Sequence, residues 1–443
     1  MMTTTPLSRL LDRMALATPP GIHLGLDRVV TLLERMGHPQ RQLQTIHVAG
    51  TNGKGSVIAF LEAILLAQGY SVARYTSPHL VRFNERIHIQ GREVADEPLV
   101  EALEQVMRLG DGIAATWFEK ITVATFWLLV QQGLGISGAN QGVVLLETGM
   151  GGRLDATNVV DPLLTLITAI GLDHTEYLGS NIEAVAREKA GILKPGVPAI
   201  TSCGPGPARE VISARAAVIG APLLLPGVDY RFEIAETSYD WVFEDAAGRL
   251  ILPAPGLAGR HQYENAALAV AGARALAECG WPVSKAAIDA GLARVSWPGR
   301  LEFLSGTPEV LLDGAHNPLG MTALARFLAE SHRDPASRTL IFSALNDKDL
   351  HAMVALLAPR VGQVVVVSVG GARACATEVL GSLWRDRGKK VWETIDFQEA
   401  WSRASDITPP GGQILVSGSL YLVGRAHSLL DSRRSCESGG HSS

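Results

Sequence analysis

The chain has little of what marks disulfide-rich, zinc-binding or membrane-spanning proteins. Its 443 residues include only four cysteines, which are Cys203, Cys279, Cys375 and Cys436. They form no CxxC pair or other zinc spacing, so we expect free thiols in a reducing compartment. No apolar run approaches the roughly 20 residues that span a bilayer. The longest candidate, Ile121–Val130, is too short.

Strong charge is also missing. The formal net charge is −5 and charged residues make up 19% of the chain, so its electrostatics predict neither a nucleic-acid nor a membrane partner. The first residues, Met1–Leu11, lack the apolar core of a secretory signal, and we expect a cytoplasmic protein. A hydrophobic fraction of 47% over 443 residues indicates an α/β enzyme with two or three domains.

The most informative segment is the glycine-rich run Gly50–Ser56. It follows a predicted buried strand at Leu43–Ala49 and precedes a predicted helix at Val57–Leu66. Such a loop binds phosphate, because glycines let backbone N–H groups approach an anion and the helix N-terminus adds positive potential. Lys54 adds a full charge, and a hydroxyl such as that of Ser56 can reach Mg²⁺ or phosphate. The spacing differs from the general P-loop pattern, because Gly55 separates Lys54 from Ser56.

The surrounding pattern predicts a mostly parallel sheet in an N-terminal domain. Val143–Leu146 and Leu163–Thr168 are continuous apolar runs, as expected for strands covered on both faces. Alternating residues at Tyr230–Ile234 and Asp240–Glu244 predict a small antiparallel insertion or edge, and Asn265–Ala277 an alanine-rich helix.

A second α/β series follows Trp297-Pro298-Gly299, where we place the domain boundary. Its predicted strands are Glu309–Leu312, Thr339–Phe342, Val364–Ser368 and Gln413–Ser417, and its predicted helices include Gly320–Glu330 and Leu350–Leu357. We therefore predict domains at residues 1–297 and 298–430, with a disordered tail at 431–443.

Polar residues follow several of these strands. Glu147, at a strand end before a glycine turn, either binds Mg²⁺ or caps the turn, and a neighbouring phosphate loop favours the metal. His174 follows the next strand, but imidazole is an uncommon Mg²⁺ ligand, so position alone does not make it one. Lys189 lies near a helix C-terminus, where a lysine is favourable for dipole reasons alone. The Ser77–Ile87 loop, which contains Arg82, is either a surface crossover or a cover over a charged substrate.

The second domain shows the same pattern. Asp313, at the end of its first strand, is placed to bind a ribose hydroxyl, while His316 or Asn317 either contributes to a site or caps the next helix. Arg300, at the boundary, either bridges to a nucleotide or is a linker residue. Ser417 ends the last predicted strand.

Taken together, these motifs resemble the Mur ligase superfamily, and within it the bacterial bifunctional dihydrofolate synthase/folylpolyglutamate synthase family. The resemblance covers nearly the whole chain, and several ordered motifs are far more specific than one glycine loop. The matching segments are residues 25–29, 50–56, 77–87, 147–158, 172–175, 187–191, 298–300, 313–318 and 417–420.

The resemblance implies an N-terminal P-loop ATPase domain with a mostly parallel sheet and a C-terminal Rossmann-like α/β domain. It implies catalytic roles for Lys54, Lys189 and His316. It implies ATP contacts from Thr51, Asn52, Gly53, Lys54, Asn265, Arg300 and Asp313. It implies two Mg²⁺ ions held by Ser77, Glu147, His174 and a carbamylated Lys189, a modification that turns a cation into a carboxylate-like ligand. It implies substrate contacts from Ile22, His23, Arg82, Thr116, Trp117, Phe118, Glu119, Leu154, Asp155, Ala156 and Ser417.

The implied activity is an ATP-dependent ligase that adds L-glutamate to dihydropteroate and to reduced folates through an acyl phosphate. The implied partners are these small molecules, and the implied state is a monomer. Two alternatives remain: another amino-acid ligase of the superfamily, or a nucleotide-binding ATPase module that forms no amide.

Overall fold

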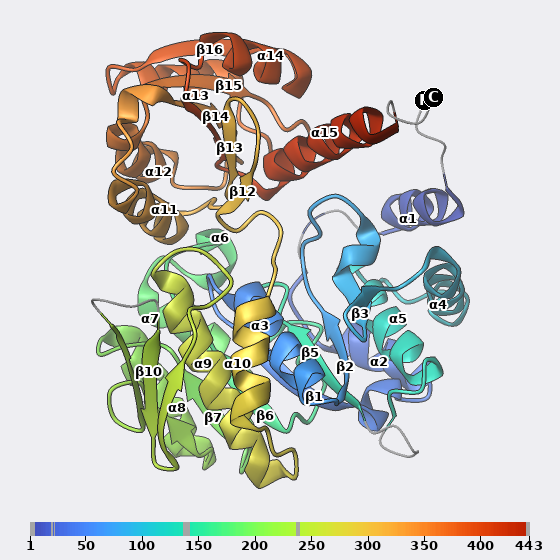
Figure 1. The fold of residues 1–443 in the computed structure, drawn as a ribbon. Helices are drawn as coiled ribbons and strands as arrows, with labels where there is room; N and C mark the ends of the chain where they lie inside the picture. The colour runs from blue at the N-terminus through green and yellow to red at the C-terminus, as the bar shows by residue number, and fades with distance from the viewer. Residues whose placement is uncertain (1–4, 19–20, 22, 136–141, 236–239, 440–443) are drawn as a thin grey trace. The chain divides into compact units, whose positions relative to one another are not determined.

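The computed structural model describes residues 5–18, 21, 23–135, 142–235 and 240–439, and it divides into two compact units (Figure 1). The first unit comprises Met1–Ile170, Leu178–Gly256 and Tyr263–Val295; the second comprises Gly171–Tyr177, Leu257–Gln262 and Ser296–Ser443. The last crossing between them, after Val295, falls close to the predicted boundary at 297. Two short segments inside the predicted first domain, 171–177 and 257–262, belong instead to the second unit.

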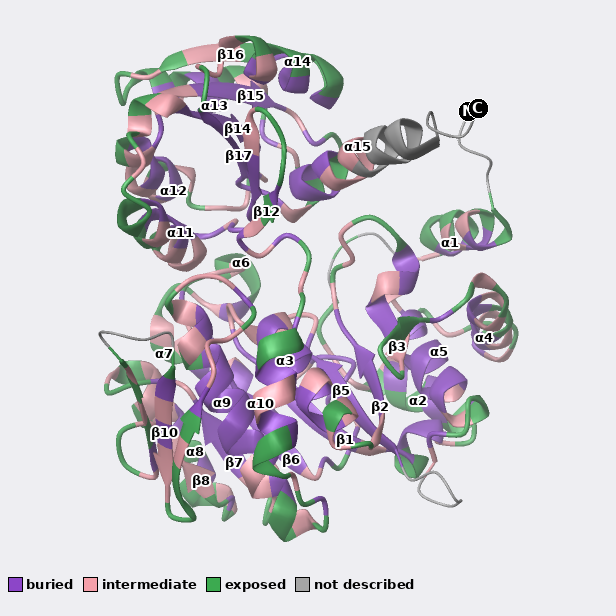
Figure 2. Ribbon diagram, in the orientation of Figure 1, coloured by how far each residue is buried: buried purple, intermediate pink, exposed green. Residues whose placement is uncertain are grey.

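An eight-stranded sheet forms the centre of the first unit, in the order β4-β3-β2-β5-β1-β6-β7-β8. Its strands are β1 (Gln44–Ala49), β2 (Ser71–Tyr75), β3 (Ile87–Ile89), β4 (Arg92–Glu93), β5 (Gly142–Glu147), β6 (Leu164–Ile167), β7 (Ala199–Thr201) and β8 (Leu223–Leu224). The six strands β2, β5, β1, β6, β7 and β8 run parallel, and β3 is antiparallel to both of its neighbours, β2 and β4. The prediction of a parallel sheet is confirmed, and Figure 2 shows its central strands as buried.

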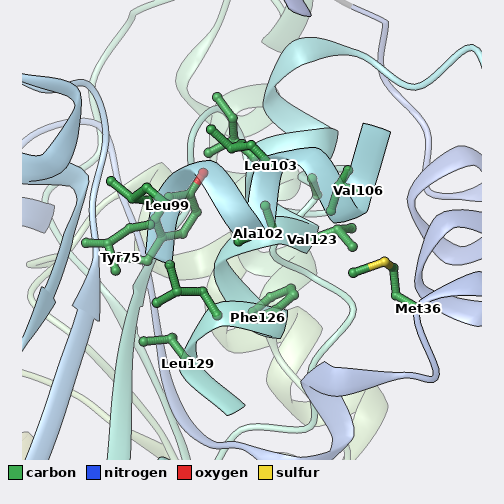
Figure 3. Packing of buried hydrophobic residues seen from close by; sticks show 14 of the residues in the cluster. Met36, Tyr75, Leu99, Ala102, Leu103, Val106, Val123, Phe126 and Leu129 are labelled. Carbon is green, nitrogen blue, oxygen red and sulfur yellow. The ribbon is translucent and has the colours of Figure 1, made fainter. Parts of the chain in front are cut away.

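Helices cover this sheet and contribute most of the apolar core. They are α1 (Pro6–Leu16), α2 (Asp27–Arg35), α3 (Lys54–Ala67), α4 (Asp96–Leu109), α5 (Trp117–Gln131), α7 (Ile182–Lys189), α8 (Pro207–Ile219), α9 (His261–Ala275, whose first two residues belong to the second unit) and α10 (Lys285–Arg294). Short 3₁₀ turns lie at Pro39–Gln42, Phe83–Arg86, Ala190–Ile192 and Leu276–Cys279. One core cluster joins α4 and α5 to β2, and Figure 3 shows Val123 and Phe126 of α5 beside Ala102 and Val106 of α4. This packing holds the middle of α5 against α4.

A separate antiparallel sheet confirms the predicted insertion. Its strands are β9 (Tyr230–Ile234), β10 (Trp241–Asp245) and β11 (Gly248–Leu252), in the order β11-β10-β9. Tyr230 of β9 and Trp241 and Phe243 of β10 are buried, whereas the residues that alternate with them are more exposed. That burial explains the alternating pattern of the sequence.

The second unit contains a six-stranded sheet in the order β12-β13-β17-β14-β15-β16. Its strands are β12 (Glu302–Leu304), β13 (Glu309–Leu312), β14 (Arg338–Phe342), β15 (Gln363–Val367), β16 (Lys390–Thr394) and β17 (Gln413–Ser417). Only β12 is antiparallel to its neighbour. The four predicted strands are all present, while β12 and β16 at the edges were not predicted.

The helices of the second unit are α6 (Thr175–Leu178, whose last residue belongs to the first unit), α11 (Pro318–Glu330), α12 (Leu350–Leu357), α13 (Thr377–Arg385), α14 (Phe397–Ile407) and α15 (Leu420–Gly439), with 3₁₀ turns at Pro335–Ser337 and Ala358–Arg360. Helix α15 continues to Gly439, so residues 431–439 are helical where a disordered tail was predicted; residues 440–443 lie outside the described part. None of the helices in the described residues is both long enough and apolar enough to cross a bilayer.

Candidate ATP and folate site

The glycine loop joins β1 to α3, as predicted, and α3 begins at Lys54. Gly53 adopts a left-handed backbone with φ of 93°. A Cβ added there would overlap the amide oxygen of Asn265, so this predicted nucleotide residue lies directly against the loop. The N–H groups of Thr51 and Asn52 donate to the carbonyl of Ala169 at 2.9 and 3.4 Å. Beyond them, the start of α3 offers the N-terminal amides that favour an anion.

Two lysines meet at the carbonyl oxygen of Gly50. Lys54 Nζ donates to this oxygen at 3.1 Å, and Lys189 Nζ, from the last residue of α7, donates to it at 2.7 Å. Lys189 is buried, whereas the side chain of Lys54 retains 15% exposure. A favourable interaction with the helix dipole is therefore not the whole role of Lys189, because its amine also contacts the phosphate loop.

Glu147 and Ser77 lie together beside Lys54. The backbone N–H of Ser77 donates to Glu147 Oε2 at 3.0 Å, and Glu147 Oε1 lies 3.8 Å from Lys54 Nζ. Glu147 is 6% exposed at the end of β5. A carboxylate and a hydroxyl residue at one point are hard oxygen donors, so they fit Mg²⁺.

The four predicted metal ligands are divided between the units. Ser77, Glu147 and Lys189 belong to the first unit, and His174 belongs to the second. Among the described residues, no group of three or more His, Cys, Asp or Glu side chains is arranged to hold a metal ion.

The predicted folate residues at the start of α5 are tightly organised. Thr116 and Glu119 form a capping box, in which Glu119 N donates to Thr116 Oγ1 and Thr116 N donates to Glu119 Oε2 at 2.6 Å. Arg28 donates to both oxygens of Glu119 at 3.1 and 2.9 Å, and its Nη2 also donates to the carbonyl of His23 at 2.6 Å. Arg28 falls within the matching segment 25–29, but the sequence did not predict that its side chain joins His23 to Glu119 at the start of α5.

Aromatic and cationic side chains join the Ser77–Ile87 loop to α5. The guanidinium of Arg86 lies 5.2 Å from the ring of Trp117, and Phe118 stacks on Tyr75 with centroids 6.2 Å apart. Arg82, by contrast, has a side chain that is 63% exposed. The loop therefore contacts the beginning of α5 through Arg86.

The remaining predicted substrate residues lie in three places. Leu154, Asp155 and Ala156 follow β5, and Asp155 and Ala156 are buried. Ser417, at the end of β17 in the second unit, is buried, and its hydroxyl has no hydrogen-bond partner within the described residues. Ile22 lies outside the described residues.

In the second unit, Asp313 organises the predicted nucleotide residues. Its carboxylate accepts from the N–H groups of Leu301 and Ala315, both at 3.0 Å. Burial raises the pKa of Asp313, and the charge of Arg300 opposes that rise. His316 Nδ1 lies 2.8 Å from the Gly314 carbonyl, and burial lowers the pKa of His316 to about 4, so the ring is neutral at pH 7.

A second cluster of this unit was not predicted. Asp173 Oδ1 accepts from Lys348 Nζ at 2.5 Å, Asp173 Oδ2 accepts from Asn317 Nδ2 at 2.8 Å, and His316 Nε2 is 3.8 Å away. Although burial opposes it, the charge of Lys348 lowers the pKa of Asp173, so the carboxylate stays ionised. The sequence feature that could have indicated Lys348 is its position in the polar turn after the predicted strand Thr339–Phe342.

Comparison with known proteins gives the family. The model of the Mur ligase glutamate ligase domain matches residues 299–420. Over 91% of this chain and 94% of its own length, the dihydrofolate synthase/folylpolyglutamate synthase of Bacillus subtilis is 36% identical. The chain belongs to the dihydrofolate synthase/folylpolyglutamate synthase family. Both the resemblance inferred from the motifs and the predicted two-part α/β fold are confirmed.

Solved structures of this family agree over the whole fold. Escherichia coli FolC in complex with DHPP and ADP is similar with a TM-score of 0.88 and 34% identity, over 97% of this chain and 99% of that one. A bifunctional folylpolyglutamate synthase/dihydrofolate synthase with Mn, AMPPNP and L-glutamate bound has a TM-score of 0.84 and 33% identity, over 97% and 98%. A nucleotide and a divalent metal are therefore ligands of this family.

Proposed function

We propose that this chain is an ATP-dependent ligase that joins L-glutamate to dihydropteroate, forming dihydrofolate, and to reduced folates, forming polyglutamates. The observation that carries the proposal is end-to-end similarity to relatives named for both activities, at 36% identity over 91% of the chain. One related structure holds DHPP with ADP, and another holds L-glutamate with AMPPNP and Mn. Together these ligands represent a pterin substrate, the amino acid, the nucleotide and a divalent ion.

The chemistry explains why ATP is needed. A carboxylate is a poor acyl donor, because its oxygen is a poor leaving group. Transfer of the γ-phosphoryl group to the carboxylate gives an acyl phosphate, and the amine of glutamate then attacks the acyl carbon and releases phosphate. Preorganised positive groups lower the barrier of the first step by stabilising charge on the transferring phosphoryl group.

The first unit supplies such groups. The start of α3 provides backbone N–H groups, and Lys54 provides a cation 3.8 Å from Glu147. Glu147 and Ser77 would hold Mg²⁺, which supplies further positive charge to the phosphates when bound. Asn265 lies against Gly53, and so we assign it a nucleotide contact in the same unit.

The assignment of a second metal ion rests on Lys189. We propose that its amine is carbamylated in the active enzyme and that His174 is a metal ligand. Support comes from the place of Lys189, buried against the loop at Gly50, where a carbamate would keep one N–H able to donate to that carbonyl and add two anionic oxygens able to hold a metal. Intact mass of enzyme kept in bicarbonate should exceed that of acid-treated enzyme by one CO₂, and Lys189→Ala should abolish the difference.

The second unit provides the remaining residues of this proposal. We assign nucleotide contacts to Arg300 and Asp313, catalysis to His316, and glutamate or folate contact to Ser417. The His316 ring is neutral at pH 7 and its Nδ1 lies 2.8 Å from the Gly314 carbonyl, which holds the ring in one orientation and supports its assignment. The monomeric state and the cytoplasmic location stay predictions.

One assay tests the function directly. Purified protein with ATP, Mg²⁺ and L-glutamate should convert dihydropteroate to dihydrofolate and lengthen tetrahydrofolate by glutamate residues, with one phosphate released per bond. Omission of glutamate is the control and should stop sustained phosphate release. Glutamate-independent release that dihydropteroate leaves unchanged would make the chain an ATPase, and ligation of another amino acid instead would make it a different ligase of the superfamily.

A further inference from the structure

A chain of buried polar side chains links the phosphate-loop strand to the predicted folate loop. His47, which is fully buried on β1 three residues before Gly50, has its Nε2 2.8 Å from Thr157 Oγ1. Thr157 Oγ1 in turn donates to Asp155 Oδ1 at 2.6 Å. None of the functional assignments above uses His47 or Thr157.

The donors and acceptors of this chain have one consistent order. Thr157 has a single hydroxyl hydrogen, which it gives to Asp155, so its oxygen accepts the hydrogen on His47 Nε2. Burial, with a further contribution from the charge of Lys194, lowers the pKa of His47 to about 3, so the ring is neutral. Within the described residues, Nδ1 of His47 has no hydrogen-bond partner, as expected if the ring proton is on Nε2.

Asp155, held by Thr157, also accepts hydrogen bonds from the turn after Glu147. Its Oδ1 also accepts from Thr157 N at 3.0 Å, and its Oδ2 accepts from Met150 N at 2.9 Å. A backbone hydrogen bond from Gly149 reaches the same carboxylate. The carboxylate therefore organises its own loop.

The turn that Asp155 holds lies against a predicted folate residue. A Cβ added to Gly149 would fall 2.8 Å from Cε1 of Phe118. Ala156, in the same loop, belongs to the apolar cluster that Phe118 packs against. A shift of the loop would therefore displace Phe118.

We propose that His47 and Thr157 are positioning residues for the folate substrate, holding Asp155 so that the Gly149–Ala156 loop and Phe118 keep the shape that binds the pterin-bearing substrate. This inference rests on the proposed function. It requires the hydrogen bonds themselves, because removal of one partner leaves a buried polar group unsatisfied and lets the loop rearrange. Because both hydrogen bonds run toward Asp155 and the loop against Phe118, the effect should concern the folate more than ATP.

Steady-state kinetics of the full-length enzyme test the proposal. Thr157→Val conserves volume but removes the hydroxyl, and His47→Leu removes the donor. Each should raise the KM for dihydropteroate about tenfold, as expected for the loss of about 1.4 kcal/mol, with the KM for ATP within about twofold of wild type. Thr157→Ser, which keeps the hydroxyl, and His47→Gln, whose amide N–H can replace Nε2–H, should stay near wild type.

Thr45→Val is the matched control. Thr45 is buried on the same strand, two residues before His47, and its hydroxyl has no partner within the described residues. The proposal is overturned if Thr157→Val matches Thr45→Val in KM for dihydropteroate, or if both substrates change equally. A lower melting temperature with unchanged KM also overturns it. If His47→Leu does not fold, comparison of Thr157→Val with Thr157→Ser still tests the proposal. Absence of dihydrofolate formation by the wild type would instead refute the proposed function.

Discussion

At the scale of single residues, the phosphate loop concentrates positive charge around one carbonyl. Lys54 and Lys189 both donate to Gly50, and Glu147 lies 3.8 Å from Lys54. Lys54 is the more exposed of the two amines, so it can leave the carbonyl for a phosphate at little cost. Lys189 is buried at the end of α7 and is held in place.

Substitution of Lys54 by alanine should remove catalysis and keep the fold. We expect kcat to fall about a hundredfold or more, as for loss of one preorganised group that stabilises transition-state charge. Lys285→Ala, at an exposed lysine of α10, is the control and should leave kcat unchanged. Near wild-type ligation by Lys54→Ala, with phosphate release measured under saturating substrates, would remove Lys54 from the phosphate site.

At the scale of elements, the beginning of α5 depends on one carboxylate. Glu119 caps its own helix through Thr116 and accepts two hydrogen bonds from Arg28 of α2, which also binds the carbonyl of His23. Glu119 is buried, so each of its bonds is shielded from water.

Glu119→Gln should weaken both the stability and the folate site. The amide places an NH₂ group against donors that need an acceptor, and we expect a loss of about 1–3 kcal/mol in the free energy of unfolding. The KM for dihydropteroate should rise while that for ATP stays constant. Glu34→Gln, at an exposed position of α2, is the control. Urea unfolding and kinetics that do not separate the two variants would contradict this role.

The buried His47 of β1 should make the free energy of unfolding depend on pH. In the folded state burial lowers the pKa of His47 to about 3, whereas in the unfolded chain its pKa is about 6.5. Between these two pH values, only the unfolded state carries the proton on this ring. Acidification through this window therefore destabilises the wild type by up to about 1.4 kcal/mol per pH unit relative to His47→Gln. The other histidines titrate in both proteins and cancel. Parallel unfolding free energies from pH 7 to 4 would contradict the assignment.

At the scale of the whole molecule, the chain enters the second unit three times. Residues 171–177 and 257–262 join it before the chain enters finally at Ser296. The segment 171–177 contains Asp173, the closest carboxylate to Lys348 among the described residues. The side chain of Lys348 is only 4% exposed. The other carboxylate near Lys348 is Asp347, at 3.9 Å, which Arg373 binds at 2.7 Å.

In the full chain, Lys348→Met should lower the stability of the second unit, because Asp173 then lacks its cation. In a fragment of residues 296–443, which lacks Asp173, the same substitution should cost less stability. Calorimetry of both proteins measures this difference, and an equal loss in both would contradict it. Lys389→Met, which removes a bond only to the Val361 carbonyl, is the control.

Much of the site followed from local pattern. Continuous apolar runs predicted β1, β5, β6, β13, β14, β15 and β17, and the polar residues after them included Lys54, Glu147, Asp313 and His316. This succeeds because parallel strands buried on both faces must be apolar, and their carboxyl ends share one edge. Local pattern did not predict β12 or β16, since both edge strands are partly exposed and lack a continuous apolar run.

Other features depended on contacts distant in sequence. Arg28 meets Glu119 across 91 residues, Asp173 meets Lys348 across 175, and His47 meets Thr157 across 110. No spacing rule links such pairs, because only packing of whole elements brings them together. The motifs and apolar runs by themselves determined the family, the phosphate loop and most of the central strands, but not the order of the strands in each sheet. The tertiary structure alone decided which charges are buried and what each is paired with, because burial and pairing depend on neighbours that the chain supplies from far away.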